Sequence, residues 1–199
     1  MKVSKEKAAE HRAAIITAAS RLFRERGFDG VGVAEITRAA GLTHGGFYGH
    51  FASKDALAAE AFEDAFAGSL ARIAARSGAD SGGLPRYLGS YLSTRHRDAP
   101  RDGCPMAAVA TEVTRQDSQV QAGFASGIAA YIAAFEALLP IQESPAARRG
   151  RAILMVSSLV GGMALARAVA ESDAALSREI LDRLHGQLLA LSGEGGQQA

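Results

Sequence analysis

The stretch that decides the fold is VAEITRAAGLTHGGFYGHFASKDAL, residues 33–57. It predicts a short amphipathic helix over 33–40, a glycine turn, a second short helix near 43–51, and a longer helix that opens at Ser53. Two short helices joined by such a turn are the parts of a helix-turn-helix. The apolar side chains expected to fix this pair against the preceding helix are Ile36, Ala40, Leu42 and Phe47.

The second short helix of this pair would present a small, polar and aromatic surface rather than a charged one. Tyr48 and His50 can hydrogen-bond phosphates from such a surface. Lys54 would place a cation beside the free backbone N–H groups of the next helix, which is a suitable phosphate site. The same residues also fit an aromatic and glycine-rich turn in an ordinary helical bundle. The pattern alone therefore leaves both interpretations open.

Helical patterns continue outward from this stretch in both directions. Ala-rich segments with apolar residues three and four positions apart recur along the chain, and alternating strand-like runs do not. The sequence therefore predicts an all-α fold of nine helices, three in residues 1–52 and six in residues 53–199, with 53–76 connecting the two domains. The expected helices lie over 7–26, 33–40, 43–51, 53–76, around 84–92, from 106, and over 117–139, 145–169 and 174–191.

Composition sets the class of protein without indicating a function. The chain has 199 residues, of which 48% are apolar and 22% charged, with a net charge of +1, and these are ordinary values for a globular domain. One cysteine rules out an intrachain disulfide, and together with the lack of a visible signal peptide it predicts a cytoplasmic protein. No uninterrupted apolar run of ~18 residues is evident, so we expect no membrane partner.

The sequence contains no recognisable catalytic motif. Its five histidines are scattered, and none forms the one-turn pair of a metal-binding helix. There is no Gly-x-Ser-x-Gly nucleophile elbow, and the segment HGGFYG lacks the Lys-Ser/Thr of a phosphate-binding loop. We therefore expect no catalytic residues, no metal and no cofactor.

Residues 12–60 resemble the DNA-binding domain of the TetR/AcrR family of bacterial transcriptional regulators. The resemblance rests on AASRLFRERGFDG (18–30), VAEITRAAGLTHGGFYGHF (33–51) and SKDAL (53–57), and its most specific part is the Phe-Tyr-x-His-Phe core followed by Lys54. It covers about a quarter of the chain. It implies a domain that binds operator DNA as a dimer, followed by a helical domain whose small ligand releases the DNA.

The resemblance also implies roles for individual positions. The DNA-binding residues that it predicts are Arg38, Thr43, His44, Gly45, Gly46, Tyr48, Gly49, His50 and Lys54. Three positions depart from the family pattern. Gly32 stands where Ser or Thr commonly caps the second helix, Gly46 replaces a usual Thr or Ser, and Gly49 replaces a larger side chain. Fewer side chains remain to read bases, so phosphate contacts and DNA shape would carry more of the binding.

The last two expected helices, within residues 145–191, are candidates for the dimer interface. Family members that this chain resembles pair through a four-helix bundle of these helices. A stripe of Leu176, Ile180, Leu184 and Leu188 is the candidate partner face, although these helices could equally pack within one protomer. A dimer would space two recognition helices ~34–36 Å apart, one per major-groove face of a palindrome.

The middle of the chain contains candidates for an apolar ligand cavity with a few hydroxyls. The residues predicted to contact a ligand are Phe66, Tyr87, Tyr91, Cys104, Met106, Phe124 and Tyr131. Aromatic and Met residues at helical spacing are also the ordinary content of a core. With the resemblance, these residues imply a repressor that is released from operator DNA by a small apolar ligand or by modification of Cys104. The alternatives are a DNA-binding helical protein without ligand sensing and an all-helical enzyme.

Cys104 is a second candidate trigger. It precedes a predicted short helix, where backbone N–H groups favour a thiolate, and Arg97 and Arg101 are close in sequence. A Gly-Cys at this junction resembles that of TetR-type regulators which sense electrophiles or oxidants. The alternative is a small buried residue that only fills space.

Overall fold

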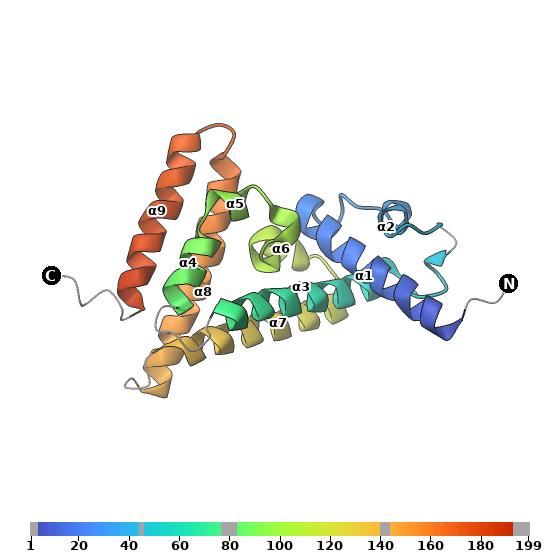
Figure 1. The fold of residues 1–199 in the computed structure, drawn as a ribbon, viewed down its shortest axis with the longest axis horizontal. Coiled ribbons are helices and arrows are strands. Elements are labelled where there is room, and N and C mark those ends of the chain that lie inside the picture. The colour runs from blue at the N-terminus through green and yellow to red at the C-terminus, as the bar shows by residue number, and fades with distance from the viewer. Residues whose placement is uncertain (1–3, 44–45, 77–82, 140–143, 193–199) are drawn as a thin grey trace.

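The computed structural model describes residues 4–43, 46–76, 83–139 and 144–192, and this part of the chain is all-helical (Figure 1). It contains nine α-helices and one 3-10 turn, so the all-α prediction is confirmed. The helices are α1 (Lys5–Arg26), α2 (Val33–Ala39), α3 (Lys54–Arg76), α4 (Gly83–Tyr91), α5 (Thr94–Arg97), α6 (Pro105–Val113), α7 (Ser118–Leu138), α8 (Pro145–Val169) and α9 (Ala174–Leu191), with the 3-10 turn η2 (Pro100–Asp102) between α5 and α6.

Helices α1 and α2 and the segment that follows α2 form one end of the molecule, which we call the head (described residues 4–53). The head is built around fully buried Phe23, Ile36 and Phe47, as the sequence predicted for the last two. Helix α1 ends at Gly27, whose φ of 77° lies in the left-handed region that favours glycine. Helix α3 leaves the head with Ser53 as its cap, because the Ser53 hydroxyl accepts a hydrogen bond from the Ala56 amide at 3.0 Å.

Helices α3 and α7 run side by side along the middle of the molecule and join the head to the rest (Figure 1). The Phe124 ring of α7 meets two α3 rings edge-on, Phe62 at 5.5 Å and Phe66 at 5.1 Å between ring centroids. The close approach requires Gly127, because a Cβ there would lie 2.3 Å from the Phe66 ring. The phenylalanines thus act as a rigid core between the helices.

Helices α8 and α9 form the end opposite the head and pack against each other (Figure 1). Helix α8 begins as predicted from Ser144 and Pro145, since the Ser144 hydroxyl accepts from the Ala147 amide at 3.2 Å. A Cβ at Gly162 would lie 2.0 Å from a Leu184 methyl group, so glycine lets the two helices come together. Much of the expected partner face of α9 therefore packs within the protomer. Leu188 is buried and Leu184 is half-buried.

The outward face of α8 is apolar and uncovered. Leu154 is 51% exposed and Leu165 is 61% exposed, and Ile153 beside them is 42% exposed. Contrary to the expectation that no segment would qualify, α8 is long and apolar enough to cross a membrane, with a mean hydropathy of 1.8 in its most apolar window. By length and composition alone, the core helix of a water-soluble protein passes the same test. The inner face of α8 packs on α6, α7 and α9.

Two local elements differ from the sequence expectation. Residues 97–105 were expected to break the chain, but the four-residue helix α5 and the turn η2 occupy 94–102. The expected short helix over 43–51 is not a continuous α-helix in its described residues. It consists of separate helical turns, in which the Gly46 amide bonds the Thr43 carbonyl and the His50 and Phe51 amides bond the Phe47 carbonyl. Three glycines lower the helix propensity of this segment.

Candidate functional site

The predicted recognition segment lies at the surface of the head. Phe47 anchors it from within, and the Tyr48 ring next to it is 66% exposed. Thr43 and Gly49 are exposed, and His50 is half-buried with its ring edge-on to that of His11 in α1, 6.5 Å between centroids. The predicted residues His44 and Gly45 lie outside the described residues. Among its described residues, the segment therefore presents one large, well-exposed side chain, Tyr48.

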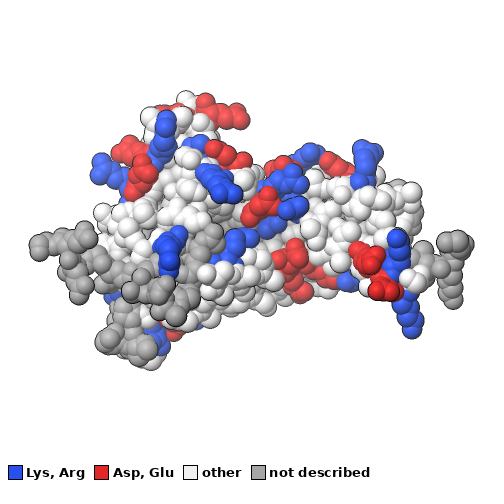
Figure 2. All heavy atoms as spheres, in the orientation of Figure 1, with Lys and Arg blue, Asp and Glu red and all other residues white. Residues whose placement is uncertain are grey.

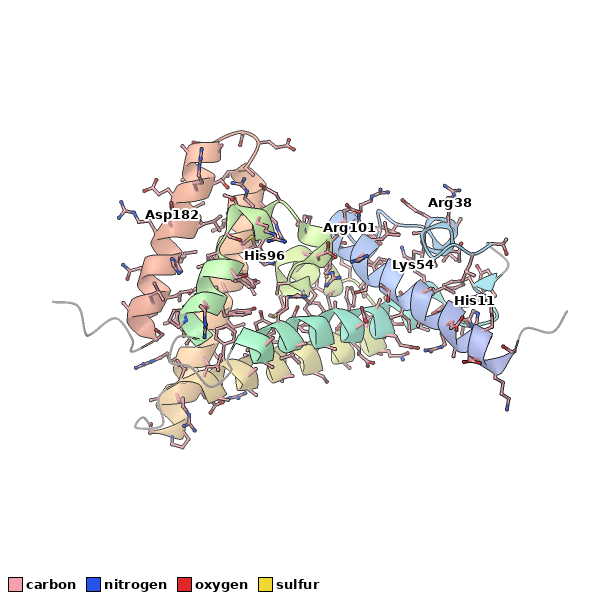
Figure 3. The ribbon with its side chains drawn as sticks, in the orientation of Figure 1. His11, Arg38, Lys54, His96, Arg101 and Asp182 are labelled. Atoms are coloured by element: carbon pink, nitrogen blue, oxygen red, sulfur yellow. The ribbon has the colours of Figure 1, made fainter. Side chains whose placement is uncertain are left out.

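Charge on the head is mixed rather than uniformly basic. Arg38 is exposed at the outer surface of α2 (Figure 3). On the face drawn in Figure 2, basic and acidic side chains are interspersed. Arg26 forms an ion pair with Glu35, and Arg12 forms one with Glu60 at 2.5 Å. Such surface pairs contribute little to stability. A continuous basic patch is not visible on this face. Any binding of phosphates by this face would therefore depend on a few individually placed groups.

Lys54 points back into the head. Its ammonium donates a hydrogen bond to the Phe28 carbonyl at 2.6 Å and lies 4.1 Å from the centre of the Phe28 ring. Burial lowers the pKa of Lys54, and the charges of Asp29, Asp55 and Glu112 oppose that shift. An ammonium has three donors, so one bond to Phe28 leaves two for another acceptor.

The glycines that depart from the family pattern face open space. A Cβ at Gly32 or Gly46 would meet no atom within 4 Å, and one at Gly49 would make only an ordinary contact at 3.6 Å. Gly32 caps α2 in extended conformation with no side-chain hydrogen bond to the helix. A Cβ would thus fit at these three positions without rearrangement.

A cavity of about 330 Å³ lies between the central helices and the α4–α6 region. It receives side chains from α3, α4, α5, η2, α7 and the loops around them. Its lining residues are Ser69, Arg72, Tyr87, Ser90, Tyr91, Ser93, Arg95, His96, Ala99, Asp102, Cys104 and Tyr131. The lining is as polar as it is apolar, which differs from the apolar cavity that the sequence predicted. We call this cavity the pocket.

The structure divides the predicted ligand contacts into two groups. Tyr87, Tyr91, Cys104 and Tyr131 line the pocket, whereas Phe66, Met106 and Phe124 do not line it and belong to the core. Sequence reasoning missed the serines, the two arginines and His96. These residues come from separate elements, and α5, which carries two of them, has no periodic pattern that would reveal it.

His96 is held by both ring nitrogens. Its Nδ1 donates to the Tyr91 carbonyl at 2.7 Å, and its Nε2 accepts the Cys104 amide at 3.1 Å. Because Nε2 accepts a hydrogen bond, the ring is neutral. Burial lowers the pKa of His96 to about 4, and the charges of Arg167 and Arg72 act in the same direction. The imidazole therefore fixes the backbone at Cys104 and is not placed as a base for its thiol.

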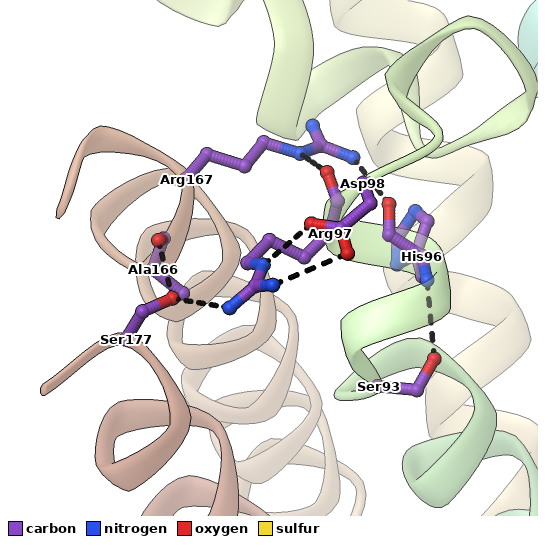
Figure 4. A network of polar contacts seen from close by, with 7 residues as sticks. All are labelled: Ser93, His96, Arg97, Asp98, Ala166, Arg167 and Ser177. Atoms are coloured by element: carbon purple, nitrogen blue, oxygen red, sulfur yellow. Dashed lines mark hydrogen bonds and ion pairs between the residues drawn. The ribbon is translucent and has the colours of Figure 1, made fainter. Parts of the chain in front are cut away.

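Arg167 of α8 ties down the segment that contains Cys104. Its guanidinium donates to the carbonyls of His96 at 2.9 Å and Arg97 at 3.1 Å (Figure 4). It also donates to the Ala107 carbonyl at 3.4 Å. We call residues 94–107 the connector. Buried donors that hold several carbonyls at once restrict the movement of a segment.

The two arginines predicted to support a Cys104 thiolate have other surroundings. The Arg97 side chain bonds Asp98 at 2.7 Å and the Ser177 hydroxyl at 2.8 Å (Figure 4), and it does not line the pocket. Arg101 is exposed in η2. The cations that face this region are instead Arg72 and Arg95, which line the pocket, and Arg167, whose charge interacts with Cys104.

The connector also contacts the head. The Gly103 carbonyl, one residue before Cys104, accepts from Arg24 of α1 at 3.2 Å and from Arg72 of α3 at 3.5 Å. Burial and the charge of Arg72 lower the pKa of Arg24 to about 10. Further along α6, the Glu112 carboxylate accepts the Phe28 amide at 2.7 Å. Side-chain hydrogen bonds thus link the head to the connector, from Arg24 to the Gly103 carbonyl and from Arg21 to Asp102 at 3.0 Å, and link it to α6 through Glu112.

The geometry defines a class of protein: an all-α chain with a helix-turn-helix head at one end and a pocket whose surrounding segments are hydrogen-bonded to that head. Comparisons with known proteins agree. Residues 15–61 match the family model described as bacterial regulatory proteins, tetR family. The HTH-type transcriptional regulator AcrR of Shigella flexneri is 40% identical over 60 residues, and the HTH-type transcriptional repressor DhaR of Mycobacterium sp. (strain GP1) is 36% identical over 53. These matches span 28% and 27% of the relatives' lengths.

Solved structures resemble the whole chain. A TetR-family transcriptional regulator from Cytophaga hutchinsonii has a TM-score of 0.75 at 20% identity, over 100% of both chains. The reduced form of E. coli NemR has a TM-score of 0.74 at 20% identity, over 89% of this chain and 94% of that one. The chain thus resembles TetR/AcrR helix-turn-helix transcriptional regulators, in sequence over residues 15–61 and in fold over most or all of its length.

Proposed function

We propose that this protein is a dimeric, cytoplasmic repressor that binds operator DNA through its head. It releases the DNA when its pocket is occupied by a ligand or when Cys104 is modified. The observation that carries the proposal is the pairing of a family-matched head with a pocket whose wall is hydrogen-bonded to that head. The pocket favours a sensor over a DNA-binding protein without ligand sensing, because a solid bundle would need no such space.

The DNA contacts proposed for the head are those predicted from the sequence. Arg38 and Tyr48 are exposed where phosphates would lie, and Lys54 keeps two donors after its bond to Phe28. Thr43, His44, Gly45, Gly46, Gly49 and His50 complete the proposed surface. With so few long side chains, its specificity rests on close backbone approach and on DNA shape.

The dimer is proposed to form through α8. Its outward face carries the exposed apolar Ile153, Leu154 and Leu165, and exposed apolar patches of this kind commonly mark interfaces. Gly161 lies on the same face with nothing within 4 Å of a built Cβ, so a second helix could approach closely. Leu176 at the start of α9 is also exposed, at 42%. Two copies of this face would form a bundle around the molecular twofold axis.

Release is proposed to pass through the connector. Anything that displaces Cys104 also moves the Gly103 carbonyl, which Arg24 of the head holds. The α6 helix that follows carries Glu112, which holds the Phe28 amide. A ligand that fits the pocket only when the connector has shifted would bias the head away from its DNA-binding position, with a typical coupling of ~1–3 kcal/mol.

Binding to DNA that flanks its own gene tests the proposal. Purified protein is titrated by fluorescence anisotropy against flanking and scrambled duplexes at two salt concentrations, because phosphate-driven affinity falls steeply with salt. Saturable binding to the flanking DNA alone, surviving the higher salt, is expected. Equal binding to both duplexes that disappears with salt would contradict a specific regulator of that gene. No binding even at low salt would contradict a DNA-binding function.

The Cys104→Ser variant tests the trigger. Serine is nearly isosteric but is not a soft nucleophile, so we expect unchanged DNA affinity and no release by a thiol-reactive electrophile that frees wild-type protein from DNA. The measurement is the anisotropy of the DNA complex against electrophile concentration. Because Cys104 is the sole cysteine, the wild-type response cannot come from another thiol. Full release in the variant would contradict the cysteine trigger and leave the ligand route standing.

A further inference from the structure

A second cavity, of about 250 Å³, lies between α1 of the head, α3 and η2. Helix α1 contributes Arg21 and Arg24 to its wall, and α3 contributes Arg72. We call this space the arginine cavity, after these three residues. It is distinct from the pocket, although Arg72 and Asp102 line both.

Arg24 is buried in the wall of the arginine cavity, and part of its hydrogen-bonding capacity is unused. The residue is only 8% exposed. Its Nη1 donates to the Gly103 carbonyl at 3.2 Å, whereas its Nε has no hydrogen-bond partner within the described part of the chain. A buried cationic donor without an acceptor is costly, and such an exception in a folded protein needs an explanation. An anion bound in the cavity would provide the missing acceptor.

The charges around the arginine cavity leave it positive. Arg21 pairs with Asp102 at 3.0 Å, and both side chains are about half exposed. That pair leaves Arg24 and Arg72 facing one further carboxylate on the wall, the solvent-exposed Asp64. Burial and the charge of Arg72 lower the pKa of Arg24 to about 10, although Asp102 and Asp64 act in the opposite direction. The carboxylates therefore do not fully balance the buried positive charge.

We propose that the arginine cavity binds a phosphate group, either as inorganic phosphate or as the phosphate of a small phosphomonoester. The donors on its wall come from two helices, with Arg24 and Thr17 on α1 and Arg72 on α3. Donors that converge from different directions suit a group with oxygens on all sides, whereas a planar carboxylate matches a single guanidinium. The volume lies below the usual range for drug-sized ligands, which fits a small anion.

The site lies at the junction between the head and the connector. Arg24 and Arg72 both donate to the Gly103 carbonyl, at 3.2 Å and 3.5 Å. A guanidinium has five N–H donors, so a phosphate can be bound without either arginine leaving that carbonyl. Binding would hold α1 and α3 together and should stabilise the folded chain. This site is independent of the proposed release of DNA through the pocket.

Gly68 of α3 allows the arginine cavity to be filled without removing a side chain. It lines the cavity, and a Cβ there would lie 3.7 Å from Nη1 of Arg72, which is an ordinary contact. Gly68→Glu places a carboxylate beside Arg72 and is expected to weaken phosphate binding at least about tenfold. Gly68→Ala is the matched control and should bind phosphate within about twofold of wild type, since it adds no charge. Both variants should fold, because each replaces a glycine inside a helix.

Arg24→Gln tests the buried cation itself. It should also weaken phosphate binding at least about tenfold, because it removes a charged donor from the wall. Arg101→Gln is its control. Arg101 is an exposed arginine of η2 that does not line the cavity, so its removal should change the affinity by less than about twofold.

Isothermal titration calorimetry of the full chain measures the binding of inorganic phosphate and, separately, of glycerol 3-phosphate. Chloride keeps the ionic strength constant, so that charge screening does not change during the titration. One saturable site per chain is expected, and the midpoint of thermal unfolding should rise with phosphate concentration. Tighter binding of the ester would identify the phosphate group of a larger molecule as the ligand. Affinity no greater than that for inorganic phosphate would identify the free ion.

Three results would overturn the proposal. The first is no saturable binding of either probe to wild-type protein, and the second is unchanged binding in Gly68→Glu, which would place the anion elsewhere on the chain. The third is an equal loss in Arg24→Gln and Arg101→Gln, which would indicate a diffuse effect of charge. Circular dichroism confirms that each variant keeps its helices. The assay contains no DNA, so its outcome is separate from that of the proposed repressor function.

Discussion

Leu165→Glu is expected to convert the dimer into a monomer and to weaken operator binding at least ~100-fold. Leu165 is 61% exposed on the outward face of α8, next to a run of apolar and small residues. In a twofold interface the substitution buries two carboxylates among apolar side chains, which is costly. A monomer contacts a single half-site, so it loses the gain in affinity of two linked heads, typically 10²–10⁴-fold.

The measurements are sedimentation velocity for mass and anisotropy for DNA affinity. Ala129→Glu, which places the same charge on an exposed position of α7, is the matched control and should change neither. Circular dichroism confirms that both variants keep their helices. A Leu165→Glu protein that remains dimeric with full DNA affinity would show that α8 is not the interface.

Glu112→Ala is expected to lower the free energy of unfolding by about 1–3 kcal/mol, because it leaves the Phe28 amide without its acceptor. The carboxylate also supports the charge of Lys54, so the variant should loosen the lysine proposed to contact phosphate. DNA affinity should fall, and its response to Cys104 modification should shrink, since the hydrogen bond between Glu112 of α6 and the head is gone.

Urea denaturation gives the stability, and the anisotropy assay gives the response. Glu112→Gln keeps an oxygen acceptor in place and should lose less than the alanine variant. Glu171→Ala, at an exposed position between α8 and α9, should stay within about 0.5 kcal/mol of wild type. A Glu112→Ala protein of unchanged stability and unchanged response would show that this hydrogen bond carries no coupling.

Much of the fold could be predicted because its signals are local. Apolar periodicity places the long helices, and the capping hydroxyls of Ser53 and Ser144 mark two of their starts, as the structure confirms. Gly27 ends α1 because a left-handed conformation is needed there. Ile36 and Phe47 are buried as expected, since both are apolar residues that pack in the core of the head.

The pocket could not be predicted in the same way, because its residues meet only after folding. Arg72, His96 and Tyr131 come from α3, α5 and α7, and no sequence spacing relates them. Periodicity also cannot tell a cavity wall from a core: Tyr131 lines the pocket, whereas Phe124, seven residues earlier on the same helix, packs between phenylalanines. The tie between Arg97 and Ser177 is equally non-local.

Hydrogen exchange at the Phe28 amide tests most directly whether the pocket controls the head. This amide belongs to the head but bonds Glu112 of α6, so its protection reports the link itself. Once the electrophile 2-cyclohexen-1-one has fully modified Cys104, hydrogen exchange at the Phe28 amide should accelerate by at least about tenfold. Amides in the interior of α1 should stay protected. Unchanged protection of Phe28 in modified protein that has released its DNA would contradict the account.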